Sequence, residues 1–126
     1  MDKELGDILI FVADDDEDFG EVIRCILKDN GYRVIVCGNG ADAVEMAAKL
    51  VPDLIMLDLI MPVKNGWTAF KEIRKNPKTS HIKVILFSSK PRLEGQYKEA
   101  DAFLQKPIPS DELLETVSRL LSGKTE

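Results

Sequence analysis

Short apolar runs alternate along the chain with longer amphipathic segments, and this alternation restricts the possible folds more than any other feature of the sequence. The apolar runs lie at residues 7–15, 32–38, 53–58, 81–89 and 101–106. Each run is short and ends at polar or turn-forming residues, a pattern typical of strands that are buried on both faces. The sequence therefore contains five candidate strands.

The segments that follow these runs have helical periodicity. They lie at residues 16–31, 40–52, 66–76, 90–100 and 109–123. In the first segment the apolar residues share one helical face: Phe19, Val22, Ile23, Ile26 and Leu27. Strands that alternate with helices predict a parallel sheet between two helix layers, with right-handed connections. The sequence thus predicts an α/β fold of the (βα)5 type.

The composition fits one globular domain and excludes several classes of function. The chain has 126 residues, of which 44% are hydrophobic and 31% are charged, which is enough for a core without disulfides. We expect a single domain over 1–126, with its core at about 7–121 and short tails at both ends. The net charge of −5 argues against direct nucleic acid binding, which needs a basic surface.

Cysteine and histidine are too scarce for zinc or histidine-based chemistry. Cys25 and Cys37 lack the spacing of metal ligands, and His81 is the only histidine. The acidic N-terminus does not resemble a signal peptide, and no apolar run approaches the length of a membrane span. We therefore expect a reduced, cytoplasmic protein with no membrane association.

Charged and hydroxyl side chains follow four of the five candidate strands. Asp14 and Asp15 end the first, Asp58 the third, Ser88 the fourth and Lys106 the fifth. In an open parallel sheet these carboxyl ends share one edge, where ligands bind, and neighbouring strands are about 5 Å apart. Carboxylates so placed suit Mg²⁺, and a carboxylate beside a cation can act as a nucleophile toward a phosphoryl group.

Each of these residues also has a purely structural interpretation. Asp14 and Asp15 could belong to the acidic cluster that favours a helix N-terminus, and Asp58 could begin a turn. Ser88 could be a strand-end hydroxyl, and Lys106 a surface lysine. Their joint occurrence on successive strands favours the functional interpretation over the structural one.

Four stretches carry a resemblance that covers nearly the whole chain, from about residue 7 to residue 121. They are "ILIFVADDDED", "PDLIMLDLIMPVKNG", "VILFSS" and "AFLQKPI". In this order they are similar to the receiver domain of two-component response regulators, including the chemotaxis regulators. The resemblance implies a flavodoxin-like, doubly wound fold with five parallel strands in the order 2-1-3-4-5, the order found in chemotaxis receivers.

The resemblance also implies a role for each matching residue. It makes Asp58 the phosphoacceptor and assigns Mg²⁺ to Asp15, Asp58 and the backbone carbonyl of Ile60 as direct ligands, with Asp14 acting through water. Lys106 would pair with the phosphoryl oxygens, and Ser88 would turn to bond them. Phe103 matches an aromatic switch position, although a strand phenylalanine can equally be core. A cis peptide is implied before Pro107.

The function implied is that of a phosphorelay component rather than an enzyme with its own substrate. A histidine kinase or a phosphotransfer protein would donate the phosphoryl group to Asp58 with Mg²⁺, and the surface would then switch to bind a protein target that the sequence does not identify. Two alternatives stay open. One is a receiver-like interaction module that works without phosphate, and the other is an aspartyl-phosphate phosphatase acting on small molecules.

One segment departs from the family pattern. Between Ser88 and Lys106 the chain is about one helical turn shorter than expected for a receiver, and the predicted fourth helix contains Pro91 and Gly95. Proline is tolerated in the first turn of a helix, but glycine weakens a helix interior by about 1 kcal/mol. We therefore predict a fourth helix that is short or partly disordered, which affects a face that receivers use to pass on their signal.

Overall fold

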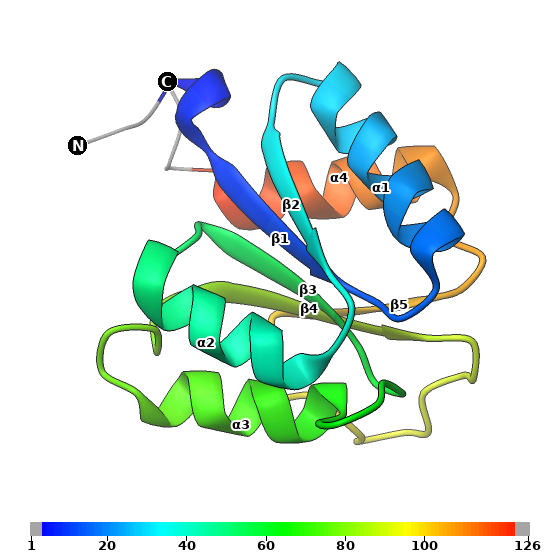
Figure 1. The fold of residues 1–126 in the computed structure, drawn as a ribbon. Coiled ribbons are helices and arrows are strands. Elements are labelled where there is room, and N and C mark those ends of the chain that lie inside the picture. The colour runs from blue at the N-terminus through cyan, green and yellow to red at the C-terminus, as the bar shows by residue number, and fades with distance from the viewer. Residues whose placement is uncertain (1–3, 123–126) are drawn as a thin grey trace.

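The computed structural model describes residues 4–122, which fold around one five-stranded sheet (Figure 1). The chain enters through a short 3-10 helix, η1 (Leu5–Asp7). The strands are β1 (Leu9–Ala13), β2 (Arg33–Cys37), β3 (Leu54–Asp58), β4 (Lys83–Ser88) and β5 (Ala102–Gln105). The helices are α1 (Glu17–Asp29), α2 (Gly40–Leu50), α3 (Gly66–Lys75) and α4 (Ser110–Leu121).

All neighbouring strands of the sheet run parallel, in the order β2-β1-β3-β4-β5. This confirms the fold class and the strand order that the sequence predicts. The register pairs Ala13 with Leu57 and Asp58 with Phe87. The carboxyl ends of β1, β3 and β4 therefore meet at one edge of the sheet.

Two apolar clusters fill the space on either side of the sheet. Helices α2 and α3 cover one face, while α1 and α4 cover the other (Figure 1). Successive residues of β1 enter opposite clusters: Phe11 lies on the α2–α3 side, and Ile10 and Val12 on the α1–α4 side. Strands β1 and β3 are buried along their whole length, as predicted for strands covered on both faces.

Polar caps set the start of the first three helices. Asp16, Asn39 and Asn65 each accept a hydrogen bond from the backbone N–H three residues later, at 3.1, 2.8 and 2.9 Å. Such caps satisfy N–H groups that have no partner within the helix. Each cap lies shortly after a strand, so it also fixes the loop that leaves the carboxyl end of the sheet.

The connection between β4 and β5 contains no helix among its described residues. Residues 94–99 form consecutive turns instead, with φ of +83° at Gly95 and +57° at Tyr97. Two left-handed positions this close together cannot belong to an α-helix, and Pro91 lacks the N–H that a helix needs. The sequence predicts a short or partly disordered helix over residues 90–100; the structure has no helix there, so this part of the (βα)5 prediction is wrong. We call residues 90–100 the turn segment.

No helix within residues 4–122 combines the length and the apolarity needed to cross a bilayer. The tails expected at the two ends fall mostly on residues 1–3 and 123–126, which lie outside the described part of the chain.

Candidate functional site

Three carboxylates converge at the edge of the sheet where β1 and β3 end. Asp14 follows β1 directly, and its N–H donates to the carbonyl of Cys37 at the end of β2, at 3.0 Å. Asp58 is the last residue of β3, and Asp15 lies next to Asp14. One ligand oxygen from each of Asp14, Asp15 and Asp58 lies within 4.8 Å of the other two. The register of β1 and β3 therefore brings these predicted site residues together.

The ammonium of Lys106 joins two of these carboxylates. Its Nζ lies 2.7 Å from Asp14 Oδ2 and 3.1 Å from Asp58 Oδ2. The same atom lies 4.3 Å from the centre of the Phe19 ring, whose face also attracts a cation. The peptide bond between Lys106 and Pro107 is cis, as the resemblance implies. Lys106 thus reaches the acids from β5, across the end of β4.

Burial and the ion pairs of Lys106 together determine the electrostatics of these residues. Asp14 is 1% exposed, and this burial raises the pKa of its carboxyl; Lys106 and the Asp16 N–H oppose the rise, and the charge of Asp58 adds to it. Burial alone would lower the pKa of Lys106, but its bonds to Asp14 and Asp58 outweigh burial and raise it. A charged Lys106 therefore balances part of the negative charge of three acids.

The donor set at this edge fits a hard divalent cation. Among residues 4–122, the buried Oδ2 of Asp14 has the Lys106 ammonium as its one partner, and Asp15 is exposed to solvent beside it. Three carboxylates with only one cation leave a net negative charge, and Mg²⁺ binds through a few carboxylates while keeping several waters. The acidic triad is thus consistent with Mg²⁺ binding.

The loop after β3 holds Asp58 through the backbone. Its Oδ1 accepts a hydrogen bond from the N–H of Ile60 at 3.1 Å, and the N–H of Gly66 donates to the carbonyl of Leu59 at 3.2 Å. A Cβ on Gly66 would lie only 2.2 Å from the carbonyl oxygen of Asp58. Only glycine permits this approach, which explains the glycine in the "DLIMPVKNG" stretch. The side chain of Ile60 is 59% exposed at the edge of the site.

Of the two predicted switch residues, Ser88 lies at the carboxyl end of β4, whereas Phe103 lies further back along β5, opposite Leu86. Ser88 ends β4 and is 3% exposed, and its Oγ accepts a hydrogen bond from the Lys90 N–H at 3.1 Å. Phe103 is half-buried in β5 and stacks on Tyr97, with ring centres 6.0 Å apart. Its ring therefore packs against the turn segment, which the sequence did not lead us to expect.

Two sets of aromatic contacts near the site were not predicted from the sequence. Phe19 reads as a packing residue of α1, yet its ring also lies against Lys106. Trp67 of α3 meets Tyr97 edge to face at 5.3 Å, so the rings of Trp67, Tyr97 and Phe103 form a chain of contacts from α3 to β5. No periodicity in the sequence links these three residues, because the turn segment has no regular structure.

Comparison with known proteins agrees with this geometry. The model of the response regulator receiver domain family matches residues 10–118. Protein PilH of Pseudomonas aeruginosa is 30% identical over 118 residues, which are 90% of this chain and 98% of that protein. Several other curated relatives are longer, and the chain spans between 12% and 53% of the length of five of them.

Solved structures share the fold closely. The chemotaxis response regulator CheY4 of Vibrio cholerae superposes with a TM-score of 0.84 at 25% identity, over 90% of this chain and 98% of that one. The receiver domain of the sensor histidine kinase PA1611 from Pseudomonas aeruginosa gives 0.82 at 28% identity, over 90% and 97% of the two chains. That structure holds a magnesium ion coordinated in its active site cleft.

Proposed function

Because the chain belongs to the family of response regulator receiver domains, we propose that Asp58 is its phosphoacceptor and that Asp14, Asp15 and Lys106 assist the transfer. The observation that carries this proposal is the Lys106 ammonium within 3.1 Å of Asp58 and 2.7 Å of Asp14, with Asp15 beside them. Family membership identifies a signalling module rather than an enzyme, which argues against a small-molecule phosphatase.

The proposed donor is the phosphohistidine of a histidine kinase or of a phosphotransfer protein. An Asp58 oxygen attacks the phosphorus, the bond from phosphorus to the donor nitrogen breaks, and an aspartyl phosphate forms on Asp58. Lys106 stays protonated and pairs with the phosphoryl oxygens. Asp14 and Asp15, with Asp58 and the carbonyl of Ile60, would hold Mg²⁺, which supplies charge neutralisation for the phosphoryl group when bound.

Ser88 is the proposed link between the phosphoryl group and the surface. Its hydroxyl would turn to donate to a phosphoryl oxygen, which breaks the bond that Oγ now accepts from the Lys90 N–H. Lys90 begins the turn segment, so a change at Ser88 passes to the segment directly. Phe103 would follow through its contact with Tyr97.

The same proposal covers the setting in which the domain acts. Residues 7–121 would form one receiver domain in the cytoplasm, with a protein as its downstream target and no direct contact to nucleic acid. The acidic net charge of −5 supports a protein partner over nucleic acid. An interaction module that works without phosphate is the alternative that the experiment below separates.

Intact mass after incubation with Mg²⁺ and acetyl phosphate tests the proposal. We expect one labile phosphoryl group on the wild type and none on Asp58→Asn. Asp29→Asn is a matched control, because Asp29 is an exposed acid at the far end of α1 and should not affect the adduct. An adduct that survives Asp58→Asn would refute the assignment. No adduct on any variant, with Mg²⁺ binding shown separately, would favour the phosphate-independent module.

A further inference from the structure

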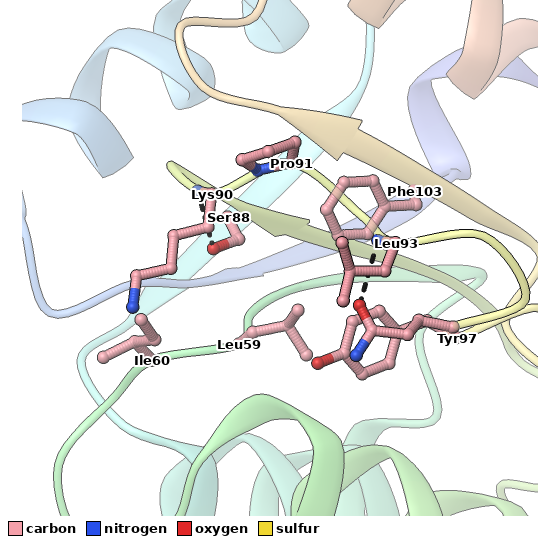
Figure 2. Close-up of a pocket in the computed structure, with 9 residues that line it drawn as sticks. Leu59, Ile60, Ser88, Lys90, Pro91, Leu93, Tyr97 and Phe103 are labelled. Carbon is pink, nitrogen blue, oxygen red and sulfur yellow. Dashed lines mark hydrogen bonds between the residues drawn. The ribbon is translucent and has the colours of Figure 1, made fainter.

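A pocket of about 500 Å³ lies beside the phosphorylation site, where the turn segment replaces a helix. Figure 2 shows Leu59 at its floor, between Ile60 and Lys90 on one side and Leu93, Tyr97 and Phe103 on the other. We call it the β4–β5 pocket. Its volume falls within the range of about 300–1,000 Å³ that is typical of small-molecule sites.

The walls of this pocket are mainly apolar, and several are exposed. Leu93 is 67% exposed and Ile60 is 59% exposed, on opposite sides of the opening. The rings of Tyr97 and Phe103 are nearly parallel, with an angle of 10° between them. Large apolar side chains gathered around one hollow mark a binding site more often than isolated ones do. Two aromatic side chains in the wall favour a ligand with an aromatic body.

A cation at the rim gives the pocket a charge preference. Lys90 lines the pocket and has no ion-pair partner among residues 4–122, although the chain carries a net charge of −5. In an acidic protein, an unpaired lysine at the edge of an apolar pocket favours an anionic ligand.

One buried polar group completes the site. Ser88 is 3% exposed and lines the pocket, and its Oγ accepts the Lys90 N–H. Within the described residues no acceptor takes the proton of this hydroxyl, so Ser88 can donate one hydrogen bond to a ligand. Apolar walls with a few polar groups that fix orientation are the usual composition of ligand pockets.

We propose that the β4–β5 pocket binds a small organic anion with an aromatic body. The body lies against Leu59, Tyr97 and Phe103, and the anionic group faces Lys90. The site itself does not depend on phosphorylation. A second part of the inference rests on the proposed function: Ser88 has one proton, so it cannot donate to a ligand and to a phosphoryl group at once. Ligand and phosphorylation therefore oppose each other.

The fluorescent anion 8-anilinonaphthalene-1-sulfonate has the required chemistry and serves as the probe. Titration into the unmodified full chain should give one site per molecule. Lys90→Met should weaken binding by about three- to fivefold, because one exposed charge pair is lost. Leu93→Asp should weaken it by about tenfold or more, because an apolar wall becomes an anion.

Two matched variants keep the test specific. Lys78→Met removes an exposed lysine before β4, at the other end of the sheet, and Leu50→Asp changes a leucine of α2 that is 52% exposed. Both should leave the probe affinity within about twofold of the wild type, because substitutions far from a site are coupled to it only weakly. Equal losses in all four variants, or several probe molecules per chain, would overturn the proposed site.

Two more outcomes are informative. If probe binding falls as the protein concentration rises while light scattering shows a dimer, a second copy covers the pocket and the small-ligand proposal is wrong. For the coupling, the probe affinity is compared before and after phosphorylation that intact mass has verified. A weaker affinity in the phosphorylated protein supports the competition for Ser88, and an unchanged affinity overturns it. If the protein is not phosphorylated, only the proposed role of Asp58 is contradicted. The titration of the unmodified protein still decides whether the pocket binds the probe.

Discussion

The acid cluster (Asp14, Asp15 and Asp58) and the turn segment are neighbours, yet they differ in how their residues are held in place. Asp14 and Asp58 are placed by strand register, by a bond to the Cys37 carbonyl and by the close approach of Gly66. The turn segment has turns in place of a helix, and most of its side chains are exposed. The chemistry thus sits on rigid strand ends, while the neighbouring surface is irregular and free to differ.

This difference explains how a receiver can lose a helix without losing its site. The acids, Ser88 and Lys106 all belong to β1, β3, β4 and β5 or lie within two residues of them. None of them depends on a helix between β4 and β5. What changes is the surface beside the site, because Lys90 and Tyr97 lie in turns where the sequence predicts a helix. The geometry of the acids is therefore independent of the structure of the turn segment.

Replacing Gly66 and Gly95 by alanine should show the largest difference in unfolding free energy between the acid cluster and the turn segment. Gly66→Ala places a Cβ 2.2 Å from the backbone of Asp58, so β3 and α3 must separate, and we expect a loss of about 3 kcal/mol in unfolding free energy. Gly95→Ala meets no atom within 4 Å and suffers only from a φ of +83°, which costs about 1 kcal/mol. Urea unfolding measures both changes.

Gly38→Ala is the control for these two variants, because an added Cβ there meets no atom within 4 Å and Gly38 needs no left-handed backbone. It should change the unfolding free energy by less than about 0.5 kcal/mol. Equal losses for Gly66→Ala and Gly95→Ala would contradict the contrast between a rigid site and a tolerant turn segment.

Removing the site cation should have the next largest effect. Lys106→Met leaves Asp14 and Asp58 together at a buried edge without their ammonium. We expect a loss of about 2 kcal/mol without Mg²⁺, below the value for a fully buried pair because Lys106 is 18% exposed. Added Mg²⁺ should stabilise the variant more than the wild type. Lys28→Met, at an exposed position of α1, is the control. Equal urea midpoints with and without Lys106 would contradict the proposed charge balance.

The sequence predicted the acid cluster better than the turn segment for a physical reason. In a parallel sheet, a residue at a strand end reaches the common edge whatever the rest of the chain does, so Asp14, Asp58 and Lys106 could be placed from local patterns. The left-handed φ of Tyr97 has no such signal, because few aromatic residues adopt it. Its ring contacts with Trp67 and Phe103 come from distant parts of the chain.

Tyr97 offers a test of how the two regions communicate. Tyr97→Leu removes the edge contact with Trp67 and the stack on Phe103, and we expect a loss of about 1 kcal/mol. Because Trp67 is the only tryptophan, its emission reports on this contact. Acetyl phosphate should change the emission in the wild type but not in Tyr97→Leu, although intact mass shows the adduct in both.

Tyr32→Leu is the matched control, since Tyr32 packs on the opposite face of the sheet. It should leave the response of Trp67 to phosphorylation intact. If Tyr97→Leu keeps the full response, the signal reaches Trp67 without the turn segment, and the aromatic contacts are packing alone.

The smallest expected effect concerns the reactivity of the two cysteines. The rate at which Cys37 reacts measures how rigid the carboxyl end of the sheet is, where Asp14 and Asp58 lie. Cys37 is buried at the end of β2, where its carbonyl holds the Asp14 N–H, and burial raises the pKa of its thiol to about 11. A protonated, buried thiol reacts slowly, whereas Cys25 is exposed on α1. Iodoacetamide at neutral pH should therefore modify Cys25 first, as peptide mass mapping can show.

Gly66→Ala should speed modification of Cys37, because loosening the site opens the end of β2 as well, while Gly95→Ala should not. Equal rates for Cys37 in both variants would mean that Gly66→Ala does not loosen the end of β2, which would contradict the expected coupling between Gly66 and this end of the sheet.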